Sequence, residues 1–419
     1  MSIPYKIYIL CAISLVLIFS FIKWSQLSFD TNALVSFAPT FAKSSPPGPV
    51  PPSSPSPLSS PVQLEPIAIT LVLMGEGVVH EGSVAIKSAI MYTSRPLHFH
   101  LICTEDNIAY MEKKFSLFPR PAYAIEVTYY PITAERVRDR GHRAGIGEQW
   151  NVLSKVFMHE LLVDVDKTIF MDTDMIFLVD PLELWNDFNK FEPYTLMSFP
   201  TLGPTSHPGQ ICSCIMLMNF ALMRNPSAMF MPSTLLPDTQ HSSLAVLPFA
   251  RGISDGIPSP VADETVSFDP YNPFFADQGI FHVIWLYRPT MFRHLSLRWD
   301  VSTCRQQLGI SLGSFGDELE EDMSEEDQLG RQLALEGSGE EHTLMSPGIL
   351  HFNCQDKDDI WLFEENHNPS ARFGPMVTTA LRYKWIWLNR GDGSASVKTR
   401  TETDSRWWDE RLAEAHARR

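Results

Sequence analysis

Short apolar runs alternate with amphipathic segments through the middle of the chain. Ile67–Met74, Leu97–Cys103 and Ile125–Tyr130 are rich in bulky apolar residues, which predicts buried strands. Ser83–Met91 has helical spacing, and Asn151–Val163 has the pattern of an amphipathic helix. Strands that alternate with helices predict an α/β domain with a doubly wound, mostly parallel central sheet flanked by helices.

The apolar run after the second helix is interrupted by two acids. Ile169–Met171 leads into the tripeptide D-T-D at positions 172–174, and the apolar stretch Met175–Val179 follows. A core strand would therefore end in two carboxylates, at the edge where open α/β sheets bind ligands. Buried carboxylates require a charged partner, and Mn²⁺ or Mg²⁺ carrying phosphate oxygens would serve. The alternative is a turn whose aspartates accept hydrogen bonds from backbone N–H groups.

The N-terminal region has the pattern of a membrane anchor followed by a stalk. Ile7–Ile22 is uncharged and is flanked by Lys6 and Lys23, and its length of about 16 residues is near the lower limit for a spanning helix. No small-residue cleavage site follows it, although a cleaved signal peptide is the alternative. We expect a signal anchor over residues 1–24 and a disordered Pro/Ser-rich stem over residues 25–65.

Charge is concentrated in one segment of the globular body, which we place at residues 66–390. Asp317–Glu341 contains eleven acidic residues and one arginine, so about ten of the chain's formal net charge of −16 lie in this segment. Such a block is typical of a solvated loop, so residues 315–345 are predicted to be a disordered insert. The rest of the body lacks a basic patch for nucleic acid. Residues 391–419 are predicted to be a C-terminal tail with a short helical pattern.

Six cysteines in 419 residues are too few for a disulfide scaffold. In an oxidising compartment Cys304 and Cys354 are the expected pair, because both lie in late loops, although spacing alone does not establish the geometry. Cys212-x-Cys214 is a poor zinc pattern, because no second close pair of ligands accompanies it in the sequence.

Further motifs surround D-T-D in the sequence, and their order resembles a known enzyme family. They are K-S-A-I-x-x-x-x-x-P-L-x-F-H (87–100), the helix that contains Lys155, I-C-S-C-I-M-L-M-N (211–219), A-D-Q-G (276–279), L-R-W-D (297–300), and G-I-L-H (348–351) with Lys357 behind it. The order is similar to that of the retaining, nucleotide-sugar-dependent glycosyltransferases of family 8. The nearest likeness is to the animal glucoside xylosyltransferases, which are type II enzymes of the Golgi or endoplasmic reticulum. The likeness covers about Ile67 to Trp361, apart from the acidic insert.

The resemblance implies a GT-A glycosyltransferase fold, with a Rossmann-like half that binds a UDP-sugar donor, and Mn²⁺ (or Mg²⁺) as cofactor. It implies metal ligation by Asp172, Asp174 and His351 and places Asp277 and Gln278 at the reaction centre. The donor-binding residues that it implies are Gly75, Lys155, Thr173 and Lys357. Each residue also has an ordinary structural reading, such as a helix N-cap for Asp277 or a packed histidine for His351.

The implied function is that of a UDP-xylose:glucoside α-xylosyltransferase. It would retain the anomeric configuration and act on a glycan or glycoprotein acceptor in the lumen of the Golgi or endoplasmic reticulum, as a single-pass type II membrane protein. We expect the acceptor hydroxyl to attack the face from which the phosphate leaves, with covalent displacement on Asp277 as the alternative. The other interpretations are a family-8 enzyme that uses another UDP-hexose and a catalytically silent lumenal binding or scaffold protein. A metallophosphatase or nuclease fits poorly, because the sequence shows no second ligand cluster.

Four positions depart from the pattern of the family. Cys212 and Cys214 stand where most members have Asn and Gly, so the identity of the donor sugar is open. Cys354 occupies a Gly position of the pattern H-x-x-G-x-x-K, and Asp300 replaces the Asn that is usual in near relatives.

Overall fold

The computed structural model describes residues 64–75, 77–143, 150–201, 211–224, 276–287, 289–302, 347–352 and 383–418. The predicted anchor, most of the stem, the acidic insert, Lys357, Cys304 and Cys354 all lie outside these ranges. Among the helices within them, none has both the length and the apolar character needed to cross a membrane.

An eight-stranded sheet forms the core, with the strand order β11-β3-β2-β1-β4-β7-β6-β8. Its strands are β1 (Ile67–Leu73), β2 (Leu97–Cys103), β3 (Ile125–Pro131), β4 (Lys167–Met171), β6 (Met197–Pro200), β7 (Ile215–Asn219), β8 (Phe292–Leu295) and β11 (Val397–Thr401). Every neighbouring pair is parallel except the two that involve β7, which runs against its neighbours β4 and β6. The predicted mostly parallel α/β sheet is thus confirmed.

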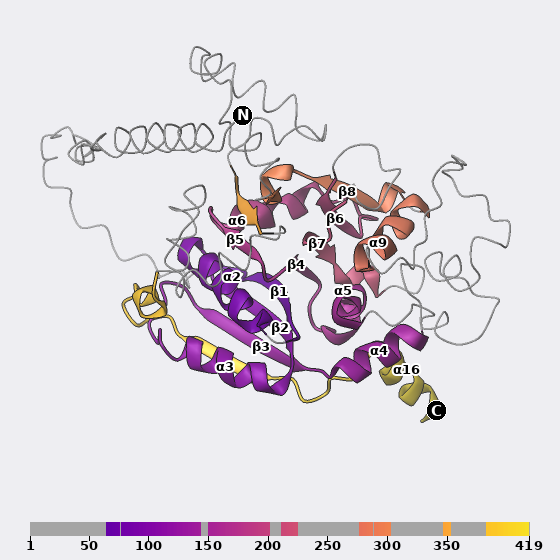
Figure 1. Cartoon of the computed structure of the whole chain (residues 1–419), viewed down its shortest axis with the longest axis horizontal. Coiled ribbons are helices and arrows are strands. Elements are labelled where there is room, and N and C mark those ends of the chain that lie inside the picture. The colour runs from indigo at the N-terminus through magenta and orange to yellow at the C-terminus, as the bar shows by residue number, and fades with distance from the viewer. Residues whose placement is uncertain are drawn as a thin grey trace, which may run out of the picture. The chain divides into compact units, whose positions relative to one another are not determined.

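Helices flank the sheet along its length (Figure 1). They are α2 (Val78–Tyr92), α3 (Glu105–Phe115), α4 (Ala134–Arg143), α5 (Trp150–Leu161), α6 (Pro181–Trp185), α7 (Phe220–Met223), α9 (Ala276–Tyr287) and α16 (Trp408–Ala417). Helix α2 begins five residues before the predicted helix at Ser83. The reason is that Val79, Ile86 and Ile90 lie on one buried face, so the apolar period starts earlier than Ser83 suggests.

A second, three-stranded sheet connects distant parts of the chain. Its strands are β5 (Met175–Phe177), β10 (Ile349–His351) and β9 (Val301–Ser302), in the order β5-β10-β9. Strand β5 directly follows D-T-D, and β10 pairs antiparallel with it so that His351 lies opposite Met175. The register therefore places His351 beside a tripeptide that lies far from it in the sequence.

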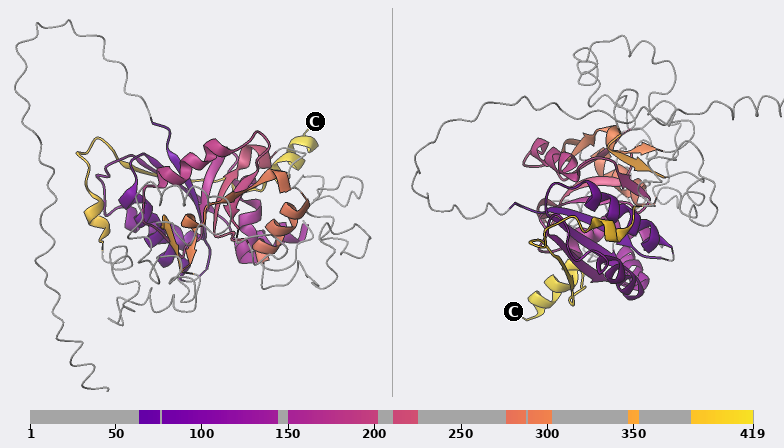
Figure 2. Two further views of the ribbon diagram at one scale, coloured as in Figure 1. Left: turned by 90° about the horizontal axis from the view of Figure 1, so that it is seen from above. Right: turned by 90° about the vertical axis from the view of Figure 1, so that its left-hand side faces the viewer.

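The C-terminal residues complete the sheet. Strand β11, which lies in the stretch that the sequence sets apart as a tail, pairs parallel with β3 at the edge of the sheet. Trp385, in the 3₁₀ helix η9 (Trp385–Leu388), packs against Phe115 and Phe118, and Trp407 packs against Phe157 of α5. Helices η9 and α16 consequently lie at opposite ends of this fold, with β11 between them (Figure 1, Figure 2).

A buried ion pair joins α4 to α5. Arg140, which is fully buried, donates two hydrogen bonds to Glu160 at 2.8 and 2.6 Å, and its guanidinium carbon lies 3.9 Å from the centroid of the Phe157 ring. His159, the neighbour of Glu160, is 1% exposed. Burial, followed by the positive charges of Arg140 and Arg224, lowers the pKa of His159 from 6.5 to about 3. The folded protein therefore keeps this imidazole neutral at mildly acidic pH.

We expect His159 to make the protein sensitive to acid. Below pH 6.5 the unfolded chain binds a proton at this residue that the folded chain does not, so the free energy of unfolding falls as the pH falls towards 3. In His159→Gln, the fall in the free energy of unfolding between roughly pH 6 and pH 4 should be smaller than in the wild type by about 2 kcal/mol. Urea unfolding at several pH values would measure this, with His80→Gln, at an exposed position of α2, as the control. An equally steep pH dependence in His159→Gln would contradict the assignment.

Candidate functional site

The D-T-D tripeptide lies at the carboxyl edge of the main sheet. Strand β4 ends at Met171, and the backbone N–H of Asp172 donates to the carbonyl of Cys214, just before β7, at 2.7 Å. Because β1 is parallel to β4, the turn after β1 lies at the same edge. Gly75 in that turn has a φ of +119°, a conformation that L side chains rarely adopt, so the position requires glycine.

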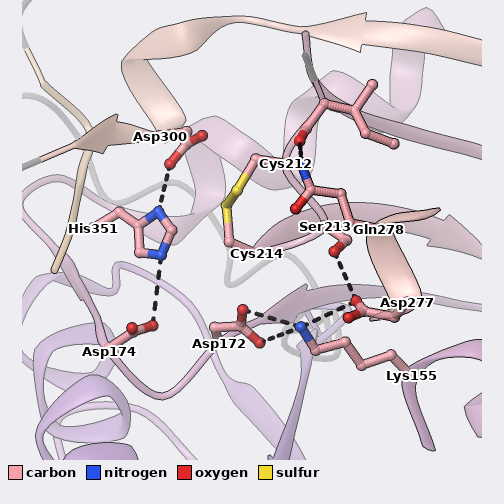
Figure 3. The surroundings of a disulfide bond; sticks show 11 residues. Lys155, Asp172, Asp174, Cys212, Ser213, Cys214, Asp277, Gln278, Asp300 and His351 are labelled. Atoms are coloured by element: carbon pink, nitrogen blue, oxygen red, sulfur yellow. Dashed lines mark hydrogen bonds and ion pairs between the residues drawn. A yellow bond between two sulfur atoms is a disulfide. The ribbon is translucent and has the colours of Figure 1, made fainter. Parts of the chain in front are cut away.

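One lysine lies between two carboxylates in this site (Figure 3). The Nζ atom of Lys155, from α5, is 2.8 Å from Oδ1 of Asp172 and 3.2 Å from Oδ2 of Asp277, at the start of α9. Lys155 and Asp277 are 7% and 5% exposed. Ser213 donates a hydrogen bond to the same Asp277 oxygen at 2.7 Å. The carboxylate of Asp277 is thus fixed by a cation and a hydroxyl from two different elements.

The site concentrates negative charge. Burial, together with the neighbouring carboxylates of Asp174 and Asp277, raises the pKa of Asp172 to about 6, against the lowering effect of Lys155. Burial would lower the pKa of Lys155, but Asp172 and Asp277 outweigh it and raise that pKa above its usual value. A single lysine therefore compensates the acids only in part, and a divalent cation would stabilise their ionised forms.

His351 lies between two aspartates on the other side of D-T-D (Figure 3). Its Nε2 atom is 3.6 Å from Oδ1 of Asp174, and its Nδ1 atom is 2.8 Å from Oδ1 of Asp300. The backbone of Phe352 also donates to the carbonyl of Asp174 at 2.9 Å. Burial lowers the pKa of His351, but the hydrogen bond and the charge of Asp300 outweigh it, so the pKa is raised overall. Asp300 fixes the orientation of the ring, and Nε2 faces Asp174.

These residues fit a divalent cation such as Mn²⁺. Asp172 and Asp174 offer the oxygen ligands that hard cations prefer, and His351 offers an imidazole nitrogen. Histidines that ligate metals usually donate their other ring N–H to a carboxylate, as Nδ1 of His351 can to Asp300. Within the described geometry, however, Asp172 interacts with Lys155 while Asp174 faces His351.

The middle residue of D-T-D connects the site to a hollow on the protein. Thr173 donates a hydrogen bond to Glu81, in the first turn of α2, at 3.1 Å. Glu81 also lines a hollow of about 540 Å³ bounded by α2, α3 and η9, whose other lining residues include His80, Lys87, Tyr110, Lys114 and Trp385. Through Glu81, D-T-D is thus hydrogen-bonded to the wall of a hollow lined by aromatic and basic side chains.

Cys212 and Cys214 form a disulfide beside the site (Figure 3). The pair expected from the sequence, Cys304–Cys354, lies outside the described residues, and the sequence predicts no partner for Cys212 or Cys214. Two cysteines separated by one residue carry no sequence signal for bonding to each other, because their geometry depends on the local backbone. Ser213, between them, binds Asp277, so this short loop contacts the acids of the site directly.

The structure brings most of the predicted site residues to one edge of the sheet, in two groups. Lys155, Asp172 and Asp277 form the first group, and Asp174 and His351 form the second. Gln278 is turned to the backbone, because its amide donates to the carbonyl of Ile211. Lys357 lies outside the described residues.

Sequence reasoning missed three polar contacts of the site. The sequence marks Asp300 only as a departure from a family pattern, and it predicts no role for Ser213 or Glu81. All three are contacts between segments far apart in the chain, to His351, Asp277 and Thr173 respectively. The replacement of Asn by Asp at position 300 was the one available signal, because a carboxylate orients a histidine more strongly than an amide does.

Comparison with known proteins identifies distant relatives among transferases. No protein-family model matches the chain. Glucoside xylosyltransferase 2 from Mus musculus is 24% identical over 245 residues, which cover 53% of this chain and 49% of that protein. Glucoside xylosyltransferase 1 from Gallus gallus is 28% identical over 134 residues, covering 30% of this chain and 29% of the relative. Xylosyl- and glucuronyltransferase LARGE1 from Homo sapiens is 27% identical over 134 residues, covering 30% of this chain and 17% of the relative.

The matched region spans about half the length of the first of these relatives and less of the other two. Among solved structures, mouse xyloside xylosyltransferase 1 in its apo form has a TM-score of 0.45 at 13% identity, and the match covers 70% of this chain and 99% of that one. The galactosyltransferase LgtC in complex with donor and acceptor sugar analogues has a TM-score of 0.44 at 12% identity, covering 77% of this chain and 95% of that one. Both structural likenesses are distant.

Proposed function

We propose that this chain belongs to glycosyltransferase family 8, together with the glucoside xylosyltransferases and LARGE1. On this premise, the chain transfers xylose from UDP-xylose to a glucoside. The transfer retains the anomeric configuration, requires Mn²⁺, and takes place on a GT-A fold. The acceptor is a glycan or glycoprotein. The reaction takes place in the lumen of the secretory pathway, with residues 7–22 as the membrane anchor.

One observation carries this proposal. Strand β10 places Nε2 of His351 3.6 Å from Asp174, although more than 170 positions separate the two residues in the chain. Both side chains lie at the carboxyl edge of the main sheet, and Asp172, two residues before Asp174, contacts Lys155 there (Figure 3). A packed histidine or a capping aspartate would not require this meeting, whereas a cation that binds a diphosphate does.

The charges of the site match the charges that move in such a transfer. Asp172, Asp174 and His351 would hold a divalent ion, which would supply positive charge to the oxygens of the departing diphosphate. Lys155 adds a fixed cation at the same edge of the sheet, in a preorganised position that needs no rearrangement as the bond breaks. The sugar meanwhile develops positive charge, which the carboxylate of Asp277 stabilises from the position fixed by Lys155 and Ser213.

The acceptor hydroxyl then bonds to the anomeric carbon from the face that the diphosphate leaves, and its proton passes to the departing phosphate. Asp277 takes part only through its charge in this scheme. Its two short contacts, to Lys155 and Ser213, lower its nucleophilicity, which favours this route over a covalent intermediate.

A donor screen tests the proposed function. The purified protein with Mn²⁺ is expected to release UDP from UDP-xylose faster than from UDP-glucose, UDP-galactose or UDP-glucuronic acid, and to transfer xylose to a glucoside. Removal of the metal with EDTA should abolish turnover, and added Mn²⁺ should restore it. Binding of UDP-sugars without turnover of any of them would overturn the proposal and favour a silent binding protein.

A further inference from the structure

Four potential metal ligands from three separate segments meet beside D-T-D. The Sγ atoms of Cys212 and Cys214, a carboxylate oxygen of Asp300 and a ring nitrogen of His351 all lie within 4.8 Å of one another. The two sulfurs are bonded to each other in the described state (Figure 3). Cys214 and His351 are 3% and 5% exposed, so the group is largely shielded from water.

These ligand types are those of a zinc site. Zinc binds cysteine thiolates, histidine nitrogen and carboxylate oxygen in a tetrahedral arrangement, with bonds of about 2.0–2.3 Å, so its ligand atoms lie roughly 3.3–3.8 Å apart. The two sulfurs must separate once the disulfide is reduced, whereas the ligand atoms of Asp300 and His351 already lie within 4.8 Å of them and of each other. Two thiolates favour zinc over Mn²⁺, because soft sulfur ligands bind hard cations weakly.

We propose that Cys212 and Cys214, when reduced, form a Zn²⁺ site with Asp300 and His351, and that the disulfide abolishes this site. The second ligand pair that the sequence lacks is supplied by β10 and by the residue that precedes β9. The zinc site depends on no substrate. Only its effect on catalysis rests on the proposed function.

Reduction of the disulfide requires a thiol reductant. A thiolate attacks the sulfur of Cys212, which is the more exposed of the pair, and the S–S bond breaks to release the thiolate of Cys214. A second thiolate resolves the mixed disulfide, so that two electrons pass to the cysteine pair and the reductant becomes its own disulfide. Zinc binding then takes the place of two protons on the cysteine sulfurs.

The two metal sites share His351. The imidazole that faces Asp174 in the described state would be bound to zinc in the reduced state, and D-T-D would lose that ligand. The carbonyl of Cys214 accepts the backbone N–H of Asp172 at 2.7 Å, so movement of the cysteine loop also reaches the first acid of D-T-D. The disulfide therefore keeps His351 available to the catalytic metal.

Zinc binding by the full-length protein tests this inference. The protein, as purified or after reduction and removal of the reductant, is dialysed against Zn²⁺ alone, and metal and protein are then quantified. We expect the reduced protein to bind Zn²⁺ at least about 100-fold more tightly than the oxidised protein, in which the proposed D-T-D site offers only nitrogen and oxygen ligands. The double variant Cys212→Ser/Cys214→Ser should bind zinc at least about 100-fold more weakly after reduction, and Asp300→Asn at least about 10-fold more weakly.

Control variants exclude zinc bound elsewhere. Cys304→Ser/Cys354→Ser and Cys103→Ala should both retain the zinc, since Cys103 is a buried thiol at the end of β2. Circular dichroism should show that every variant is folded. Reduced protein that binds no zinc, or a Cys212→Ser/Cys214→Ser variant with unchanged affinity, would overturn the inference. Zinc binding by the reduced protein, together with no sugar transfer by the oxidised protein in Mn²⁺, would instead overturn the proposed function alone.

Discussion

Asp174→Ala is expected to lower the rate of UDP release from the sugar donor by at least about 10³-fold in the presence of Mn²⁺. The variant removes the carboxylate that faces Nε2 of His351 at 3.6 Å, and with it one of the proposed metal ligands. Steady-state release of UDP would measure the loss. Titration of Mn²⁺ by electron paramagnetic resonance would show, independently of turnover, whether metal affinity falls with it.

The matched control is Asp187→Asn, which removes an aspartate from the 3₁₀ helix η2 (Asn186–Lys190), where it pairs with Lys190 at 3.2 Å. This variant should keep the wild-type rate, because its side chain has no contact with the site in the described structure. A wild-type rate in Asp174→Ala would refute the metal site at D-T-D.

Lys155→Met is expected to lower the free energy of unfolding by about 3–5 kcal/mol. The methionine keeps the length of the buried side chain but leaves the carboxylates of Asp172 and Asp277 without the cation that contacts both. An uncompensated buried charge costs far more than the net stability of the original ion pair, since its desolvation is no longer offset. Urea unfolding of the full-length protein would measure the change.

Two further variants separate this charge effect from ordinary packing. Lys155→Met/Asp277→Asn should recover part of the loss, because the double variant removes one of the two stranded charges. Lys113→Met, at an exposed position of α3, should change stability by less than about 0.5 kcal/mol. A Lys155→Met protein within 1 kcal/mol of the wild type would mean that water or another cation compensates the two acids.

Much of the main sheet could be predicted from the sequence. The apolar runs at Ile67, Leu97 and Ile125 are β1, β2 and β3, with starts that agree to the residue. Such runs report burial directly, because a strand covered on both faces has little room for polar side chains. The same pattern places Asp172 and Asp174 immediately after a core strand, and therefore at the edge of the sheet where ligands bind.

Polar contacts between distant segments were harder to predict. Strand β11 is largely exposed, so its pairing with β3 leaves no apolar signal in the sequence. Strand β10 has three residues, and the partner of its His351 depends on its register with β5. The roles of Asp300, Ser213 and Glu81 follow from hydrogen bonds to residues far along the chain, which no local pattern encodes.

The sequence by itself determined which segments are buried and which types of ligand the chain carries, because hydrophobic periodicity and side-chain chemistry are local properties. Tertiary structure alone decided which of those ligands meet. It turned Asp172 towards Lys155 and Asp174 towards His351, and it joined Cys212 to Cys214 within reach of Asp300. Strand pairing fixes such meetings to within a few ångströms, and a shift of one residue in the register of β10 would turn His351 to the opposite face of its sheet.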